Sequence, residues 1–244
     1  MSEQHSRTEA LIGKDGLGKL KKARVLVFGI GGVGGYAVEA LTRAGIGMLG
    51  LCDGDTVALS NLNRQLYATH KTININKVDA AAERIKDIAP LAVIVPYPFF
   101  YTAETAGLVD LGAFDYIVDA IDNVPSKIEL ILNAQATGVP IVSCMGTGNK
   151  LNPGGFITAD IYETSVCPLA KVMRSELKKC GVKNLTVVYS KEPPTLHRII
   201  TDEKNSNSNP GQCKKHPPAS ISFVPAAAGL VLAGKVINDL LSMP

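Results

Sequence analysis

A glycine-rich turn near the amino terminus constrains the fold of this chain more than any other feature. The sequence GIGGVG at positions 29–34 follows the β-branched run 24–28 and precedes apolar residues at helical spacing over 33–44. This order predicts a buried strand, a tight turn and a helix. Backbone N–H groups of such a turn, together with the amino terminus of the helix, can hold phosphate oxygens. The turn therefore predicts nucleotide binding without specifying the nucleotide.

Strand and helix patterns alternate as far as Lys150. We expect strands at residues 24–28, 48–52, 92–95, 116–119 and 140–143, and helices at 33–44, 77–88, 102–109 and 126–137. Repeated strand–helix units with continuously apolar strands favour a parallel sheet covered by helices on both faces. The expected fold class is α/β, a Rossmann-like doubly wound and mainly parallel sheet.

The pattern changes in the second half of the chain. Residues 156–162 alternate apolar with small or polar side chains, which is typical of a half-exposed antiparallel strand. A helix that begins at Pro168 and ends before Gly181, a polar loop at about 201–220 and a buried helix at 225–241 complete the expected elements. We expect antiparallel strands to extend the same sheet. The chain is then one domain, 1–244, with a nucleotide-binding half at 1–149 and a substrate-facing half at 150–244.

Composition excludes several classes of protein. With 46% hydrophobic residues in a chain of 244, a large core is available, so neither a disordered protein nor a disulfide scaffold is expected. The five cysteines form no Cys-x-x-Cys pair, which argues against structural zinc and for a reducing compartment. The longest apolar run, 225–234, is shorter than the roughly 20 residues that span a bilayer. We therefore expect a soluble, cytoplasmic protein.

Basic residues concentrate in the second half. The net charge is +3, yet residues 150–220 contain 11 Lys and Arg against 6 Asp and Glu. Lys171, Arg174 and Lys178 are spaced to share one helix face, and Lys179 follows them. A basic face of this kind binds phosphates without reading sequence. An ordinary solvated helix face, interrupted by Glu176, is the alternative.

Charged residues downstream of the turn distinguish two nucleotide chemistries. Asp53 ends the second expected strand, where a carboxylate can accept hydrogen bonds from ribose hydroxyls of NAD or of ATP. Hydride transfer needs a dry nicotinamide pocket, whereas attack on the α-phosphate of ATP needs cations and a metal-binding carboxylate. The segments DGDTVALSNLNRQL at 53–66 and DAIDN at 119–123, with Lys77, supply the second set. ATP is therefore favoured, and an NAD-dependent oxidoreductase is the alternative that tighter binding of NAD would indicate.

Four side chains have both a catalytic and an ordinary interpretation. Arg64 and Lys77 can neutralise charge on phosphates, Asn61 can donate a hydrogen bond to one, and Asp122 can place Mg²⁺ near the α-phosphate. Taken singly, Asn61 suits a turn, Arg64 a surface, Lys77 a solvated helix position and Asp122 a helix N-cap. Their occurrence together favours the catalytic interpretation.

These segments resemble the ubiquitin-activating-type, or ThiF-like, adenylation superfamily. The resemblance implies that a substrate carboxylate attacks the α-phosphate of Mg²⁺-bound ATP, forming an acyl-adenylate and releasing pyrophosphate. It also implies a homodimer in which Arg7, from an N-terminal helix, reaches the partner's ATP. The resemblance implicates Arg64, Asp122, Lys77 and Arg7 in catalysis, with Asp122 as the metal-associated acid. It implicates a larger set in nucleotide binding: Gly29, Gly31, Gly32, Gly34, Asp53, Asp55, Asn61, Arg64, Lys77, Asp122 and Asn123.

Further segments are similar to one branch of that superfamily, which dehydrates a threonylcarbamoyl-modified adenosine beside the tRNA anticodon. They are RTEALIG at 7–13, PLAK at 168–171 with Arg174, YSKEP at 189–193 and SISFVP at 220–225. The branch implies adenylation of the threonyl carboxylate and ring closure by the ureido group of the same side chain. The basic face with Lys171, Arg174, Lys178 and Lys179 fits this polyanionic substrate, so we expect these residues to bind the tRNA. An activator of a small sulfur-carrier protein is the alternative, and the missing Cys-x-x-Cys zinc ligands speak against it.

Cys167 raises the possibility of a thioester intermediate. It stands directly before Pro168, as an acyl-capturing thiol of a related enzyme would. No histidine or second cysteine lies close in sequence to activate it, and the intramolecular ring closure needs no thioester. We therefore expect Cys167 to be a buried or helix-capping residue.

Overall fold

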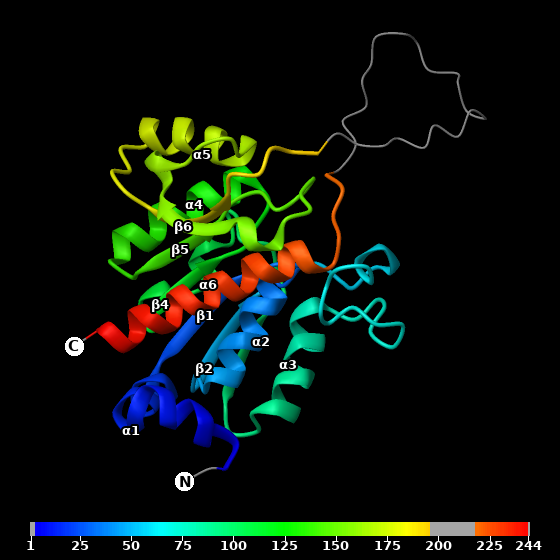
Figure 1. Ribbon diagram of the computed structural model, residues 1–244, viewed down its shortest axis with the longest axis vertical. Coiled ribbons are helices and arrows are strands. Elements are labelled where there is room, and N and C mark those ends of the chain that lie inside the picture. Colours follow the sequence, from blue (N-terminus) through cyan, green and yellow to red (C-terminus); the bar gives the residue numbers. More distant parts are fainter. Residues whose placement is uncertain (1–2, 196–217, 244) are drawn as a thin grey trace.

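The computed structural model describes residues 3–195 and 218–243 and contains one seven-stranded sheet (Figure 1). The strands are β1 Arg24–Phe28, β2 Met48–Cys52, β3 Val93–Tyr97, β4 Tyr116–Asp119, β5 Ile141–Cys144, β6 Phe156–Asp160 and β7 Thr186–Ser190. Their order across the sheet is β3-β2-β1-β4-β5-β7-β6, and only the β6–β7 pair is antiparallel. The expected mainly parallel sheet with an antiparallel extension is confirmed.

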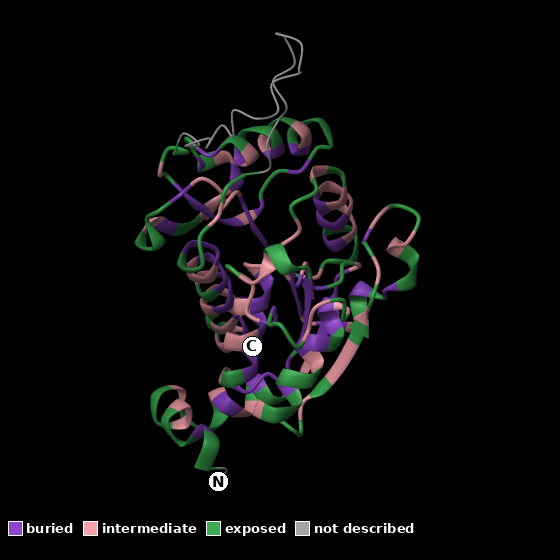
Figure 2. Ribbon diagram, turned by 90° about the vertical axis from the view of Figure 1, so that its right-hand side faces the viewer, coloured by how far each residue is buried: buried purple, intermediate pink, exposed green. Residues whose placement is uncertain are grey.

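Helices cover both faces of this sheet. They are α1 Ser6–Lys22, α2 Gly34–Ala44, α3 Lys77–Ile88, α4 Val124–Thr137, α5 Pro168–Lys179 and α6 Phe223–Ser242. Helices α2, α3 and α6 contribute to one hydrophobic cluster, while α4 and α5 contribute to the clusters on the other side. In Figure 2 the buried residues lie in the strands and on the inner faces of these helices. The layers agree with a doubly wound arrangement.

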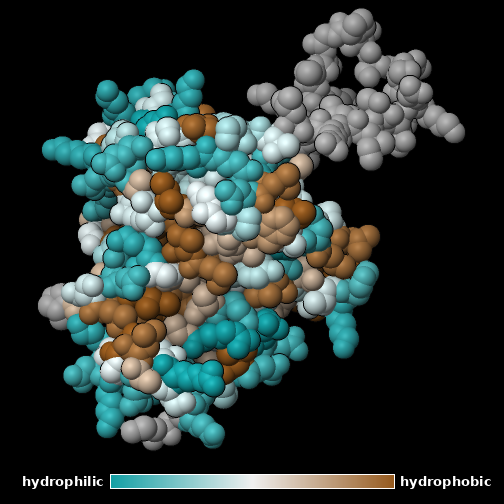
Figure 3. All heavy atoms as spheres, viewed as in Figure 1, coloured by the Kyte–Doolittle hydropathy of each residue, from teal (hydrophilic) through white to brown (hydrophobic). Residues whose placement is uncertain are grey.

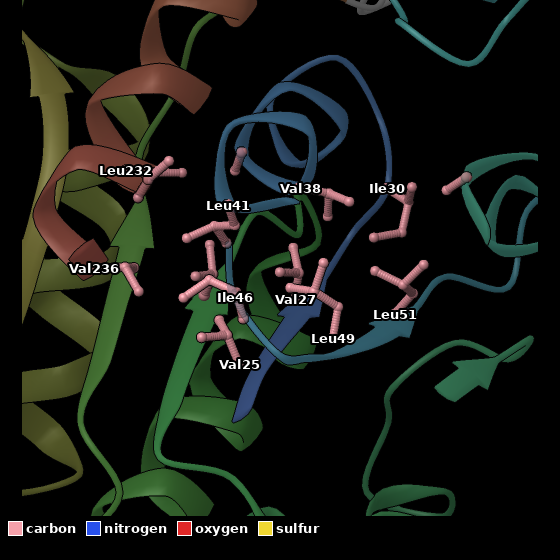
Figure 4. Packing of buried hydrophobic residues seen from close by; sticks show 14 of the residues in the cluster. Val25, Val27, Ile30, Val38, Leu41, Ile46, Leu49, Leu51, Leu232 and Val236 are labelled. Carbon is pink, nitrogen blue, oxygen red and sulfur yellow. The ribbon is translucent and has the colours of Figure 1, made fainter. Parts of the chain in front are cut away.

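Strand β1 lies at the centre of the core because both of its faces are covered. Val25 and Val27 belong to the cluster that includes α2 and α6, whereas Leu26 and Phe28 belong to the opposite cluster with α4. Figure 4 shows the first cluster, with side chains from β1, β2, α2 and α6 directed toward one another. Burial on both faces explains why the strand is continuously apolar and does not alternate.

Three expectations about elements need correction. The helix expected at 102–109 is absent, and a 3₁₀ turn, Ala106–Leu108, takes its place. The Thr105 hydroxyl accepts from the Thr102 N–H and donates to the Phe100 carbonyl, at 2.9 and 2.6 Å, so side chains satisfy the backbone in place of a helix. The strand expected at 156–162 ends at Asp160. Strand β7 was not anticipated, although its β-branched residues signal it.

Helix α6 is long and apolar enough, by length and composition, to cross a membrane. Its residues Val224, Ala228, Leu232 and Val236 are nonetheless buried in the core beside α2. Packing within this fold therefore accounts for its apolar composition. The helix expected at 225–241 is confirmed and begins two residues earlier, at Phe223.

Candidate active site

A cavity of about 660 Å³ opens at the carboxyl ends of β1, β2 and β4. Its walls come from the glycine turn, the ends of these strands, the segment after β3 and the start of α6. Of the residues singled out in the sequence, those that line it are Gly29, Gly31, Gly32, Asp53, Asp55, Arg64, Lys77, Asp122 and Asn123. The volume lies within the range of small-molecule sites, and the position is the crevice where open α/β sheets bind ligands.

The glycine turn passes closely over the loop after β4. Gly29 has φ of 84°, and a Cβ on it would lie 2.6 Å from the Ala120 carbonyl oxygen, so a side chain is excluded. Gly31 differs, because a Cβ there would meet only Gln65 Nε2, at 3.6 Å. Protein packing therefore does not require a glycine at position 31. The bare backbone leaves room for a ligand to approach.

Asp53 connects the glycine turn to the chain after β2. One carboxylate oxygen accepts from the Ile30 N–H at 2.7 Å and the other from the Asp55 N–H at 2.9 Å. Burial raises the pKa of Asp53, and the nearby Lys77 ammonium opposes that shift. The carboxylate is thus held beside the glycine turn, at the wall of the cavity.

Lys77 is buried at the first position of α3, which excludes the solvated helix position as its structural role. Its Nζ lies 2.6 Å from Asp55 Oδ2 and 3.9 Å from Asp53 Oδ2. The ammonium group is desolvated and held between two carboxylates at the cavity wall. A phosphate at this place would meet a positive charge that water screens little.

Arg64 approaches the cavity from the segment after β2. Its guanidinium donates to the Ser60 carbonyl at 3.0 Å and to Asn63 Oδ1 at 2.9 Å, so part of its hydrogen-bonding capacity remains for a ligand. Asn61 does not line the cavity. Its carbonyl oxygen accepts from the N–H groups of Arg64 and Gln65, and its side chain accepts from Ala58. In this structure Asn61 shapes the turn that presents Arg64.

Asp122 and Asn123 follow β4 and precede α4. The N-cap of α4 is Asn123, whose side chain accepts from the Ser126 N–H at 3.1 Å. Asp122 therefore does not cap the helix. Its exposed carboxylate lies at the cavity and accepts no hydrogen bond from the described residues. It is the negative group best placed to take part in metal or substrate chemistry.

Two other sequence-predicted residues lie outside the cavity. Gly34 begins α2 behind the turn, where a Cβ would lie 1.8 Å from the Gly29 carbonyl oxygen, so its role is close packing. Arg7 is exposed in the first turn of α1, which precedes β1 and lies at the opposite end of the sheet from the cavity (Figure 1). Within one chain Arg7 does not belong to this site.

Sequence reasoning missed part of the cavity wall. The aromatic run Phe99-Phe100-Tyr101 and the residue that follows it line one side, and Ser220 and Pro225 line another. An aromatic run directly after a parallel strand was the available signal for the first group. Pro225 places the start of α6 against the glycine turn, since a Cβ on Gly32 would lie 3.3 Å from its side chain.

The basic residues expected to bind tRNA lie on α5. Lys171, Lys178 and Lys179 are exposed, and Lys179 Nζ pairs with Glu176 at 2.7 Å. Arg174 is partly buried, and its guanidinium donates to the backbone and side chain of Thr164. Arg174 therefore fastens α5 to the preceding turn. Lys214 and Lys215, two further basic residues in the polar loop expected at about 201–220, lie outside the described residues.

The four cysteines in the described part of the chain are all unpaired. Cys167 is buried at the N-cap position of α5, as expected for a structural thiol. Cys213 lies outside the described residues. Cys52 lines the cavity but is buried, and burial with the nearby Asp53 charge raises the pKa of its thiol to about 12.

Alkylation of the native protein tests these thiol environments. Iodoacetamide at pH 8 is expected to label the exposed Cys180 and to spare Cys52 and Cys144, because burial raises the pKa of both thiols to about 12. Peptide mass spectrometry gives the extent at each site, and urea-unfolded protein is the fully labelled control. Rapid labelling of Cys52 in the native protein would contradict the expectation.

Comparisons with known proteins agree with this geometry. The model of the ThiF family matches residues 5–243. The tRNA threonylcarbamoyladenosine dehydratase of Bacillus subtilis is 42% identical over 244 residues, covering 99% of this chain and 96% of that protein. The Escherichia coli protein of the same name is 35% identical over 171 residues, or 70% of this chain and 64% of that one. The crystal structure of E. coli tRNA N6-threonylcarbamoyladenosine dehydratase in complex with ATP matches with a TM-score of 0.86 and 29% identity, covering 98% of this chain and 94% of that chain.

Proposed function

This chain belongs to the ThiF family, and we propose that it uses ATP to cyclise N6-threonylcarbamoyladenosine next to the anticodon of tRNA, with loss of water. One observation supports this more than the others. One cavity is lined by the glycine turn, by the Asp53 carboxylate, by the two cations Arg64 and Lys77, and by the Asp122 carboxylate, which accepts no hydrogen bond from the described residues. Activation of a carboxylate by attack on the α-phosphate of ATP needs this combination of groups.

The residues present fit ATP in a consistent orientation. The ribose is expected beside Asp53 and the phosphates over Gly31 and Gly32, where backbone and helix terminus favour negative charge. Lys77 and Arg64 then balance charge that develops as the pyrophosphate leaves. The aromatic segment that begins at Phe99 supplies the apolar wall for the base.

The donor set also fits Mg²⁺, provided the nucleotide supplies most of the ligands. Among the described residues, no three His, Cys, Asp or Glu side chains gather into a metal site. Magnesium is commonly held by one or two carboxylates together with substrate phosphates, and Asp122 is the free carboxylate at the cavity. When bound, the metal would neutralise phosphate charge, and Asp122 would orient it.

The reaction then proceeds in two balanced steps. A carboxylate oxygen of the threonyl group attacks the α-phosphorus, and the bond to the β-phosphate oxygen breaks to release pyrophosphate. The ureido group of the same side chain attacks the activated acyl carbon, loses a proton and expels AMP. No enzyme nucleophile is required, because the attacking group is tethered to the acyl carbon at high effective concentration. The protein must exclude water, which would hydrolyse the adenylate.

We assign tRNA binding to the half of the chain after residue 149. Charge reversal of the exposed Lys171 and Lys178 is expected to weaken tRNA binding about tenfold and to lower the salt dependence of binding, because two phosphate contacts are lost. Affinity for ATP stays unchanged. Binding titrations at several salt concentrations measure both effects. Lys21→Glu with Lys22→Glu, on the distant α1, is the matched control (Figure 1). Equal affinities for tRNA in the two double variants would remove α5 from the proposal.

We further propose a homodimer in which Arg7 completes the partner's site. Exposed apolar side chains such as Phe223 and Leu230 lie on α6, and Figure 3 shows hydrophobic surface where α6 crosses this face. Arg7→Ala and Arg64→Ala should each lower turnover to about 1% of wild type or less. A mixture of the two variants should regain about a quarter of wild-type turnover, because half of the dimers are hybrids with one intact site. If both variants form dimers and exchange subunits, yet their mixture regains no turnover, Arg7 does not act on the partner's site.

The decisive experiment combines the protein with ATP, Mg²⁺ and threonylcarbamoylated tRNA. The modified nucleoside is expected to lose one water, measured by mass spectrometry of the digested tRNA, with AMP and pyrophosphate as co-products. An unchanged nucleoside mass, with pyrophosphate exchange that depends on a small carrier protein, would support the carrier activator. We place this reaction in the cytoplasm, consistent with the unpaired cysteines among the described residues.

A further inference from the structure

A fully buried lysine lies directly behind the loop that presents Asp122. Lys127, in the first turn of α4, has no exposed side-chain surface, and neither has Asp119 at the end of β4. Their charged groups lie 2.8 Å apart. Desolvating such a pair is costly, and hydrophobic residues of similar volume often stabilise a core equally well. A contribution to stability alone therefore does not explain a lysine here.

The remaining contacts of Lys127 connect α4 to two other segments of backbone. Its Nζ donates to the Ile121 carbonyl at 3.0 Å and to the Cys144 carbonyl, at the end of β5, at 2.9 Å. Those two carbonyls accept its hydrogen bonds, and the Asp119 carboxylate lies beside it as the counter-charge. The Asp119 carboxylate in turn accepts from Ser143 Oγ at 2.6 Å and from the Ile121 N–H at 3.1 Å. Both polar groups of Ile121 are therefore held by this ion pair.

We propose that Lys127 is a positioning residue of the active site. The Ile121 carbonyl that it binds belongs to the planar peptide unit joining Ile121 to Asp122. Holding that carbonyl therefore fixes the orientation of the backbone at Asp122, and with it the direction of the Asp122 side chain. The preceding residue, Ala120, packs against Gly29. Lys127 thus sets the position of the Asp122 carboxylate relative to the glycine turn, without touching the nucleotide.

The test uses a neutral double variant, Lys127→Met with Asp119→Asn, because it leaves no unpaired buried charge. The amide oxygen introduced by Asp119→Asn can still accept from the Ile121 N–H, so the change removes chiefly the bonds from Lys127 to backbone carbonyls. Lys235→Met with Asp239→Asn is the matched control, since that pair on α6, at 2.7 Å, lies outside the site.

Two readouts are measured on the full-length protein. Hydrogen exchange in the peptide spanning residues 119–127 is expected to become about tenfold faster in the variant. The kcat of tRNA cyclisation is expected to fall about a hundredfold, while the KM for ATP changes by less than about threefold, because orientation of Asp122 matters in the transition state. The control pair should leave both readouts near the wild-type values.

Only the turnover readout rests on the proposed function, whereas hydrogen exchange tests the role of Lys127 independently of it. Unchanged exchange at 119–127, or a kcat within about twofold of wild type despite faster exchange, would overturn the positioning role. A wild-type protein that fails to cyclise tRNA would overturn the proposed function instead. Exchange would then decide by itself whether Lys127 holds the segment that bears Asp122.

Discussion

Arg64→Ala is expected to slow adenylation of the tRNA carboxylate by two to three orders of magnitude, a loss of roughly 3 to 4 kcal/mol of transition-state stabilisation. Arg64 lines the cavity and retains hydrogen-bonding capacity beyond its two protein acceptors. Its positive charge stabilises the transition state most, because negative charge then shifts toward the departing pyrophosphate. The loss should therefore appear in kcat more than in the KM for ATP, in pre-steady-state measurements of pyrophosphate release.

The control for this prediction is an arginine outside the cavity. Arg43 lies in the last turn of α2 and pairs with Glu39 at 2.7 Å, with more than half of its side chain exposed. Arg43→Ala is expected to leave kcat near the wild-type value. Asp122→Asn should resemble Arg64→Ala in its effect on kcat. Near-normal turnover in both site variants would show that the chemistry occurs elsewhere.

Lys127→Met alone is expected to lower the free energy of unfolding by about 3–5 kcal/mol, because it leaves the Asp119 carboxylate buried without a counter-charge. Urea denaturation followed by circular dichroism measures the change. The partly exposed pair of Lys235 with Asp239 provides the comparison, and Lys235→Met should cost less than about 1 kcal/mol.

Adding Asp119→Asn to Lys127→Met should recover most of that loss, because the uncompensated charge disappears. Recovery would show that the cost arises from the charge and not from altered packing of α4. If the single variant were as stable as the wild type, the ion pair would have to be accessible to water. The buried geometry described above would then be wrong.

Much of the fold could be predicted from local patterns. The strand, glycine turn and helix around Gly31 are present, and the other expected strands of the first half lie within two residues of their predicted positions. These elements are determined by apolar runs and glycines that act over a few residues. The helix expected at 102–109 failed because threonine hydroxyls competed for the backbone, which propensity does not reveal.

The site was less completely predictable, because several roles depend on contacts between distant segments. The cavity does bring Asp53, Arg64, Lys77 and Asp122 together, as their spacing after successive strands suggested. Nothing in the pattern of α4, however, distinguishes a buried Lys127 from a surface lysine. Arg174 likewise matched a basic face, yet its guanidinium binds Thr164 across a turn.

The start of α6 against the glycine turn has a consequence for synthesis on the ribosome. Pro225 closes one wall of a cavity whose other walls are encoded mostly before residue 150. While residues 223–242 are still inside the exit tunnel, the emerging sheet lacks this wall and exposes the apolar flank of α2. A nascent chain should therefore acquire tight affinity for nucleotide abruptly and late, after most of its strands have already paired.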